Sequence, residues 1–292
     1  MLSVILIIKI LILITAGPCG ITLNSSIVAV QLRHWMKGVN LGECDQITLI
    51  MGFTNVLLQC YFVLDGTIDT LELYEHLDKE FIFVSYTFFF FFISLWVWLT
   101  AWLAICYCLR LVNISHRVFI ILKKTVPCWI TQLLLGTVVI LAMINIPIFW
   151  TMNTKAKQNT SFTSPVDFFN YEPNIKYLSF AAALGCCLPT LITFLCMGLS
   201  LMSLLRHVQR VKQNISQSWS GKMKTHAKAC VTIFLLMALN VFFFLTVFIF
   251  ILLQLYIGNN WDTLFWSIIM ASPSGQAVIL LLGNSKLQSD IL

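Results

Sequence analysis

The residues that could perform catalysis or bind metals are few in this sequence, and their spacing matches no known reactive motif. The sequence has no HExxH zinc motif, no GxSxG nucleophile turn and no phosphate-binding P-loop. Its ten cysteines include the close pairs Cys106/Cys108 and Cys186/Cys187, whose spacing differs from the CxxC of redox and zinc sites. All ten lie in or beside apolar segments, where cysteine acts as a small hydrophobic residue. We therefore predict that the protein is not an enzyme and has no metal site and no cofactor.

The polar residues within the apolar segments are almost all neutral. Five of them stand out: Asn24, Asn55, Asn240, Ser274 and Gln276. In hydrocarbon each of these side chains needs a hydrogen-bond partner, so we expect bonds between helices. That role is favoured for Asn24 and Asn55, whereas a position facing a cavity is equally open for Asn240. The near absence of charges from these segments argues against an ion pump or ion-coupled transporter.

Aromatic side chains are concentrated in one stretch, where five phenylalanines at 88–92 precede Trp96, Trp98 and Trp102. Most of them must pack against lipid or neighbouring helices. Pockets for small molecules are mostly apolar, with a few polar groups. The third, fifth, sixth and seventh apolar segments have the composition to form such a pocket.

The elements that position these residues are seven long apolar segments. Of the 292 residues, 59% are hydrophobic and only 10% are charged, whereas soluble domains carry about 25% charged residues. About 20 apolar residues in a helix cross a bilayer core. We therefore predict an all-α membrane protein, with residues 1–292 forming a single seven-helix domain and 284–292 a short tail. The predicted helices are 2–32, 46–64, 81–109, 126–150, 177–205, 229–257 and 263–283.

The charges outside these segments predict the orientation of the bundle. Three alternate connections and the tail hold 13 of the 18 basic residues, and the opposite side holds nine of the 12 acidic ones. By the positive-inside rule the basic side is cytoplasmic, so the amino terminus is extracellular and the carboxyl terminus cytoplasmic. The net charge of +6 therefore reflects topology, and we predict no nucleic-acid partner.

The sequon at Asn159 lies in the second outer loop of this topology. The sequons at Asn113 and Asn214 would face the cytoplasm, and the sequon at Asn24 would lie inside the first helix. We therefore predict glycosylation at Asn159.

The stretch CYCLRLVNIS at 106–115 resembles FYxLKIANFS, which closes the third helix of the type 2 taste receptors, the bitter taste receptors. Other segments resemble this family in the same order along the chain. They are GITLNSSIVAV with Asn24, Trp35 with Asp45-Gln46-Ile47, Pro189 through Leu204-Leu205-Arg206-His207, Phe234-Leu235-Leu236, Pro273-Ser274, Leu282-Gly283-Asn284 and Lys286-Leu287. The similarity covers nearly the whole chain, whereas the DRY, CWxP and NPxxY motifs of rhodopsin-like receptors are absent.

Several positions depart from the family pattern. The family's arginine in helix two is Asn55, and its His-Ser pair in helix seven is Gln276-Ala277. The tryptophan and asparagine that often line the family's pocket on helix three are replaced by Phe89 and Ile93. The resemblance therefore indicates a divergent member, with a pocket wall more apolar than is usual for the family.

The resemblance implies a multi-pass plasma-membrane receptor that detects bitter small molecules and activates a heterotrimeric G protein. By family position the ligand-binding candidates are Phe89, Ile93, Asn240, Phe244 and Trp266. The candidates that face the G protein are Tyr107, Arg110, Arg117, Arg206, His207 and Lys286. For the basic residues among these, the positive-inside rule alone is an equally open explanation. The alternative function is a non-coupled membrane transporter or channel for small molecules.

Overall fold

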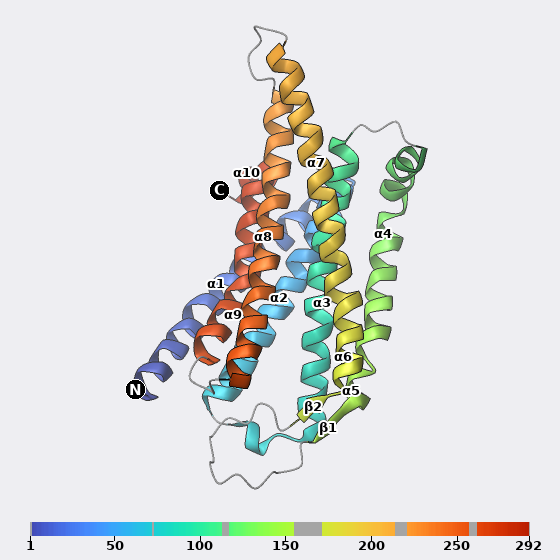
Figure 1. Ribbon diagram of the computed structural model, residues 1–292. Coiled ribbons are helices and arrows are strands. Elements are labelled where there is room, and N and C mark those ends of the chain that lie inside the picture. Colours follow the sequence, from blue (N-terminus) through green and yellow to red (C-terminus); the bar gives the residue numbers. More distant parts are fainter. Residues whose placement is uncertain are drawn as a thin grey trace.

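The computed structural model describes residues 2–71, 73–112, 117–154, 171–213, 221–256 and 262–291, and its long helices form an elongated bundle (Figure 1). The long helices are α1 (Leu2–Met36), α2 (Glu43–Thr70), α3 (Lys79–Leu111), α4 (Arg117–Asn145), α7 (Leu188–Gln213), α8 (Gly221–Tyr256) and α9 (Asp262–Gly283). The shorter elements are η1 (Leu73–His76), α5 (Ile148–Thr151), β1 (Met152–Thr154), β2 (Tyr171–Pro173), α6 (Ile175–Ala182), η2 (Ala183–Cys187) and α10 (Ser285–Ile291).

Seven helices of the described chain are long and apolar enough to cross a membrane, which confirms the predicted seven-helix fold. Their spans are Leu6–Met36, Glu43–Thr70, Lys79–Leu111, Phe119–Thr151, Lys176–Ser203, Lys228–Thr246 and Trp266–Gly283. Large apolar side chains such as Ile14, Leu135 and Leu195 are more than 60% exposed on the bundle surface. A lipid environment accounts for this exposure, because soluble proteins rarely expose large apolar patches.

The helices extend past the predicted apolar segments at several ends. Helix α2 begins at Glu43 rather than at 46, and α4 begins at Arg117 rather than at 126. The predicted segments end at the first charged residues, because only apolar residues were counted. The helices themselves continue through these charged residues at the membrane–water boundary. The ends of α7 and α8 project beyond the other helices at the top of Figure 1.

The predicted fifth helix is built from three consecutive pieces. Helix α6 leads into the five-residue π-helical turn η2, and α7 follows directly with Pro189 in its first turn. Proline has no N–H to donate, and π-turns frequently occur at functional sites. The Leu184 carbonyl in η2 accepts a hydrogen bond from the Trp98 indole of α3 at 3.1 Å. The irregular turn is therefore tied to the aromatic face of α3.

A short antiparallel ribbon closes one end of the bundle, where β1 pairs with β2 and Asn153 lies opposite Glu172. This ribbon is the only β-structure in the described residues, and the sequence prediction did not include it. Asn159, the predicted glycosylation site, falls between β1 and β2 in the sequence and lies outside the described residues.

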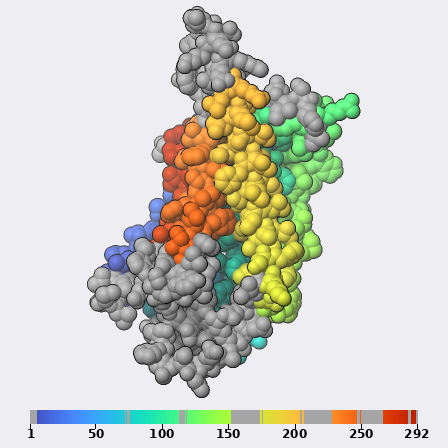
Figure 2. All heavy atoms as spheres, in the orientation of Figure 1, coloured from blue at the N-terminus to red at the C-terminus, as the bar shows by residue number. Residues whose placement is uncertain are grey.

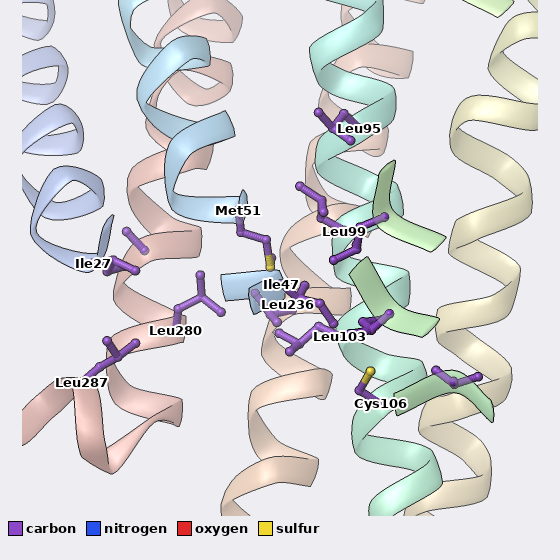
Figure 3. Packing of buried hydrophobic residues seen from close by; sticks show 14 of the residues in the cluster. Ile27, Ile47, Met51, Leu95, Leu99, Leu103, Cys106, Leu236, Leu280 and Leu287 are labelled. Carbon is purple, nitrogen blue, oxygen red and sulfur yellow. The ribbon is translucent and has the colours of Figure 1, made fainter. Parts of the chain in front are cut away.

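The main hydrophobic cluster fills one half of the bundle and contains side chains from α1, α2, α3, α4, α8, α9 and α10. Figure 3 shows Met51, Leu99, Leu103 and Leu236 converging in its centre. On the outside, α7 and α8 lie side by side and form one continuous face of the molecule (Figure 2).

Candidate functional site

A second hydrophobic cluster gathers four of the five residues that the sequence analysis assigned to a ligand pocket. Ile93 is a buried member of this cluster, and Phe89, Phe244 and Trp266 pack against it. These side chains come from α3, α8 and α9, three helices whose contact brings distant parts of the sequence together. The Phe89 ring stacks on Tyr61 of α2, with ring centroids 5.8 Å apart.

A narrow void lies within this cluster, and it is too thin to hold a water molecule. Its lining residues are Leu58, Phe62, Ile93, Trp96, Phe243, Ile269, Ser272 and Pro273. The pocket predicted from the sequence lies among the third, fifth, sixth and seventh helices, whereas this void is lined by α2, α3, α8 and α9. A ligand of drug-like size would have to displace side chains to enter, because such pockets measure about 300–1,000 Å³.

Trp96 lines the void but was not among the residues predicted to bind ligand. Its side chain is 1% exposed and its ring packs against Phe243, with centroids 5.3 Å apart. The Trp96 indole nitrogen has no hydrogen-bond acceptor among the described residues. The signal that could have identified it is its spacing, because residues three apart share a helical face and Trp96 follows Ile93 by three.

Asn240, the fifth predicted pocket residue, is buried on α8 with 1% of its surface exposed. Its side-chain oxygen Oδ1 accepts no hydrogen bond from the described residues. An unsatisfied buried acceptor costs about 1–3 kcal/mol. Asn240 is therefore a polar group that a bound molecule or water could satisfy, although it is absent from the lining of the void.

A hydrogen-bonded network of neutral side chains joins four helices beside the void. Asn55 Nδ2 donates to Asn24 Oδ1 at 2.9 Å and to Gln276 Oε1 at 2.8 Å. Gln276 Nε2 in turn donates to the Thr100 hydroxyl at 3.2 Å, so α1, α2, α3 and α9 are linked. All four side chains are at most 1% exposed. The predicted interhelical role of Asn24, Asn55 and Gln276 is therefore confirmed.

The network also brings together two of the positions that depart from the family pattern. Asn55 and Gln276, which stand where the resemblance leads one to expect arginine and histidine, bond directly to each other. Two neutral amides complement one another as donor and acceptor. The two departures from the family pattern, Asn55 in place of arginine and Gln276 in place of histidine, are therefore physically coupled in this chain.

The end of the bundle nearest the predicted outer loops carries a charged contact. Lys9 of α1 forms an ion pair with Asp69 of α2 and lies over the Trp266 ring of α9, 5.7 Å from its centroid. Trp266 also packs against Gly66, where an added Cβ would overlap its ring. These contacts fix the position of Trp266 relative to α1 and α2.

Comparison with known proteins identifies the chain's relatives. The family model described as "Taste receptor protein (TAS2R)" matches residues 1–292. The chain belongs to the TAS2R family. It is 25% identical to taste receptor type 2 member 41 of Pan paniscus, over 92% of this chain and 89% of that relative. It is 28% identical to taste receptor type 2 member 9 of Macaca mulatta, over 94% of this chain and 88% of that relative.

Family membership confirms the function predicted from the sequence resemblance. The protein is a G-protein-coupled bitter taste receptor, a multi-pass protein of the plasma membrane. None of these matches favours the alternative of a transporter or channel. A receptor of this family is not expected to be an enzyme, and the described residues contain no cluster of ligands able to hold a metal ion.

The residues that the sequence analysis assigned to the G protein lie on helices that end away from the β1–β2 ribbon (Figure 1). Arg117 and Arg206 are exposed, and Tyr107 packs against the main hydrophobic cluster. The side chains of His207 and Lys286 lie outside the described residues.

Arg110, the remaining candidate for contact with the G protein, is held by a neighbouring helix. Its Nη2 atom lies 3.1 Å from Glu43 Oε2 at the start of α2. The hydroxyl of Ser203 on α7 donates to the Leu111 carbonyl at 3.3 Å, which joins α3 to a third helix at the same level.

Proposed function

We propose that this taste receptor binds an apolar bitter molecule between α2, α3, α8 and α9, beside Ile93 and Trp96. The observation that carries the proposal is the gathering of Phe89, Ile93, Phe244 and Trp266 in one cluster. Ile93 also lines the narrow void in this cluster, together with Trp96. The void has no room for a water molecule, so agonist binding has to be coupled to side-chain or helix movement. A ligand shifts a conformational equilibrium only through different affinities for the two states, and a pocket that must open provides that difference.

The polar content of this site sets the chemistry of its ligand. Phe89 and Ile93 offer no hydrogen bond, whereas the unpaired indole N–H of Trp96 offers a donor. A flat, apolar molecule with one acceptor, such as a carbonyl or ether oxygen, matches this arrangement. Asn240 on α8 does not line the void, but its unpartnered Oδ1 could accept a hydrogen bond from a hydroxyl or amine of the ligand once the site opens.

The amino terminus is proposed to be extracellular, with the loop 65–80 outside and 206–228 inside. Alternation of basic and acidic connections along the sequence supports this orientation. Asn159 is then accessible to glycosylation in the second outer loop.

The proposed G-protein surface comprises Tyr107, Arg110, Arg117, Arg206, His207 and Lys286. Changing Arg110 and Arg206 to alanine should lower signalling without abolishing agonist binding, because both lie at the end of the bundle proposed to face the cytoplasm. Agonist potency and maximal response unchanged at equal surface expression would show that neither residue contacts the transducer.

The function is tested by a calcium-release screen of bitter compounds in cells that express the receptor with a promiscuous G protein. Cells with the G protein alone are the control. We expect at least one small, largely apolar agonist whose response depends on the receptor. Transport of the same compounds without G-protein activation would support the transporter alternative instead.

A further inference from the structure

A cleft of about 170 Å³ opens between the ends of α2, α3 and α4. On α3 it begins at Cys106, ten residues after Trp96 of the agonist site. Its lining residues are Glu43, Cys106, Leu109, Arg110, Lys123, Val126 and Pro127. This volume has room for several water molecules, unlike the narrow void near Trp96. Three charged side chains on one side and four apolar or weakly polar residues on the other give the cleft an amphipathic lining.

The charged side of the cleft carries two cations and one carboxylate. Arg110 pairs with Glu43 through Nη2, but its side chain is 60% exposed and that of Glu43 30% exposed. Solvent screens a pair of this kind, so its net contribution to stability is small and another anion can compete for the guanidinium. Lys123 is exposed and forms no ion pair within the described part of the chain. The site therefore has a net charge of +1 and an available ammonium group.

The apolar side of the cleft consists of buried chain. Cys106, Leu109 and Val126 are each 6–7% exposed, and Pro127 follows in the same helix as Val126. An inorganic anion would need only the cations, whereas a molecule with both an anionic group and a hydrocarbon chain matches both sides of the cleft.

The position of the cleft agrees with this chemistry. Its residues lie near the ends of the membrane spans Glu43–Thr70, Lys79–Leu111 and Phe119–Thr151. Lipid headgroups lie at this depth, and in the proposed orientation they belong to the cytoplasmic leaflet, which is rich in anionic lipids. Basic pockets between transmembrane helices on that side are suited to phosphate-bearing headgroups.

We propose that this cleft binds the phosphate headgroup of an anionic phospholipid of the cytoplasmic leaflet. Lys123 and Arg110 contact the phosphate, and the first part of the acyl chain lies against Leu109 and Val126. Arginine suits phosphate because its planar fork donates two parallel hydrogen bonds, and lysine adds a compact charge. The headgroup competes with Glu43 for Arg110, so lipid binding weakens the link between α2 and α3.

The test uses purified full-length receptor in detergent micelles and dioctanoyl phosphatidylinositol 4-phosphate as the probe. Binding is measured as the concentration-dependent rise of the thermal unfolding midpoint. Lys123→Gln should weaken binding about five-fold, since one basic side chain near a lipid surface contributes about 1 kcal/mol. Lys124→Gln is the matched control, because Lys124 is exposed on the same helix but does not line the cleft. The affinity of the Lys124→Gln variant for the phosphoinositide should stay within two-fold of wild type.

Two further probes separate the sources of the anion. Inorganic phosphate and dioctanoyl phosphatidylcholine should both stabilise the receptor much less than the phosphoinositide does. Equal stabilisation by inorganic phosphate would identify a soluble-anion site, and equal stabilisation by phosphatidylcholine would identify an apolar contact only; either result overturns the proposal. So does an equal loss of affinity in the two lysine variants, which would indicate diffuse surface attraction. The agonist response of both variants is measured in parallel, so failure of the lipid site is distinguishable from failure of the receptor function.

Discussion

The buried contact between Asn55 and Gln276 gives the sharpest quantitative prediction from the structure. Gln276→Leu keeps most of the side-chain volume but removes two hydrogen bonds, one from Asn55 Nδ2 at 2.8 Å and one to the Thr100 hydroxyl at 3.2 Å. Asn55 Nδ2 retains its bond to Asn24. The Thr100 hydroxyl likewise continues to donate to the Trp96 carbonyl, so neither group is left without a partner.

The expected loss of stability follows from these bonds. Interhelical hydrogen bonds in membrane proteins contribute about 0.6 kcal/mol on average and at most about 1.7 kcal/mol. Gln276→Leu should therefore lower the free energy of unfolding by about 1–2 kcal/mol. Asn55→Leu removes the shared bond and the bond to Asn24, so its cost should be similar. The double variant should lose about 1 kcal/mol less free energy of unfolding than the sum of the two single losses, because each single variant already removes the bond that the two residues share.

The assay is reversible unfolding of the purified receptor by SDS in mixed micelles, for the wild type, both single variants and the double variant. The control cycle uses Thr131→Val and Gln46→Leu, whose hydrogen bond of 2.9 Å is exposed. Gln46 lies three residues from the start of the membrane span Glu43–Thr70, where water competes for an exposed bond, so the control coupling should be below about 0.5 kcal/mol. If the losses from Asn55→Leu and Gln276→Leu are additive, with a coupling energy no larger than that of the control cycle, the two residues are not coupled and the reasoning is refuted.

Three other predictions concern the helix packing, the outer loop and the topology. Gly66→Ala should lower the free energy of unfolding by about 1–3 kcal/mol and also lower agonist potency, because the new methyl group overlaps the Trp266 ring. Gly136→Ala should be neutral or stabilising, since no atom lies within 4 Å of its added Cβ. Thermal unfolding and dose-response curves of both variants decide this, and equal effects would contradict it. Asn159→Gln should remove one glycan and raise gel mobility, and unchanged mobility of receptor that has reached the surface would show that the site is unused. A tag inserted in 206–228 should be inaccessible to antibody on intact cells; labelling there would overturn the proposed orientation.

The sequence was sufficient to predict the seven helices, because hydropathy over about 20 residues is a direct consequence of bilayer thickness. It could not predict where the helices end, since Glu43 and Arg117 are charged and yet continue the helical hydrogen-bond pattern. The π-helical turn at Ala183–Cys187 also has no signature in composition. The structure shows that one carbonyl of this turn, that of Leu184, accepts a hydrogen bond from Trp98 of α3, a contact far apart in the sequence.

The candidate site was predictable in its membership but not in its pairing. Neutral amides in apolar segments must find partners, which correctly indicated Asn24, Asn55 and Gln276. Which amide bonds to which depends on helix rotation and crossing, and these are fixed by contacts far apart in the sequence. Trp96 was missed for the same reason, because in a stretch dense in aromatic residues only the neighbouring helices determine which ring has an unpaired N–H.

The central claim is that the agonist occupies the space beside Ile93 and Trp96, and agonist dose-response curves at matched surface expression test it most directly. Ile93→Asn should weaken apolar agonists about 5- to 150-fold, since it introduces an unpaired amide costing about 1–3 kcal/mol. Trp96→Phe should weaken agonists that carry an acceptor about 2- to 10-fold, whereas Trp98→Phe, whose indole already donates to Leu184, should leave potency unchanged. Unchanged potency of every agonist in both Ile93→Asn and Trp96→Phe would contradict the claim and place the binding site elsewhere.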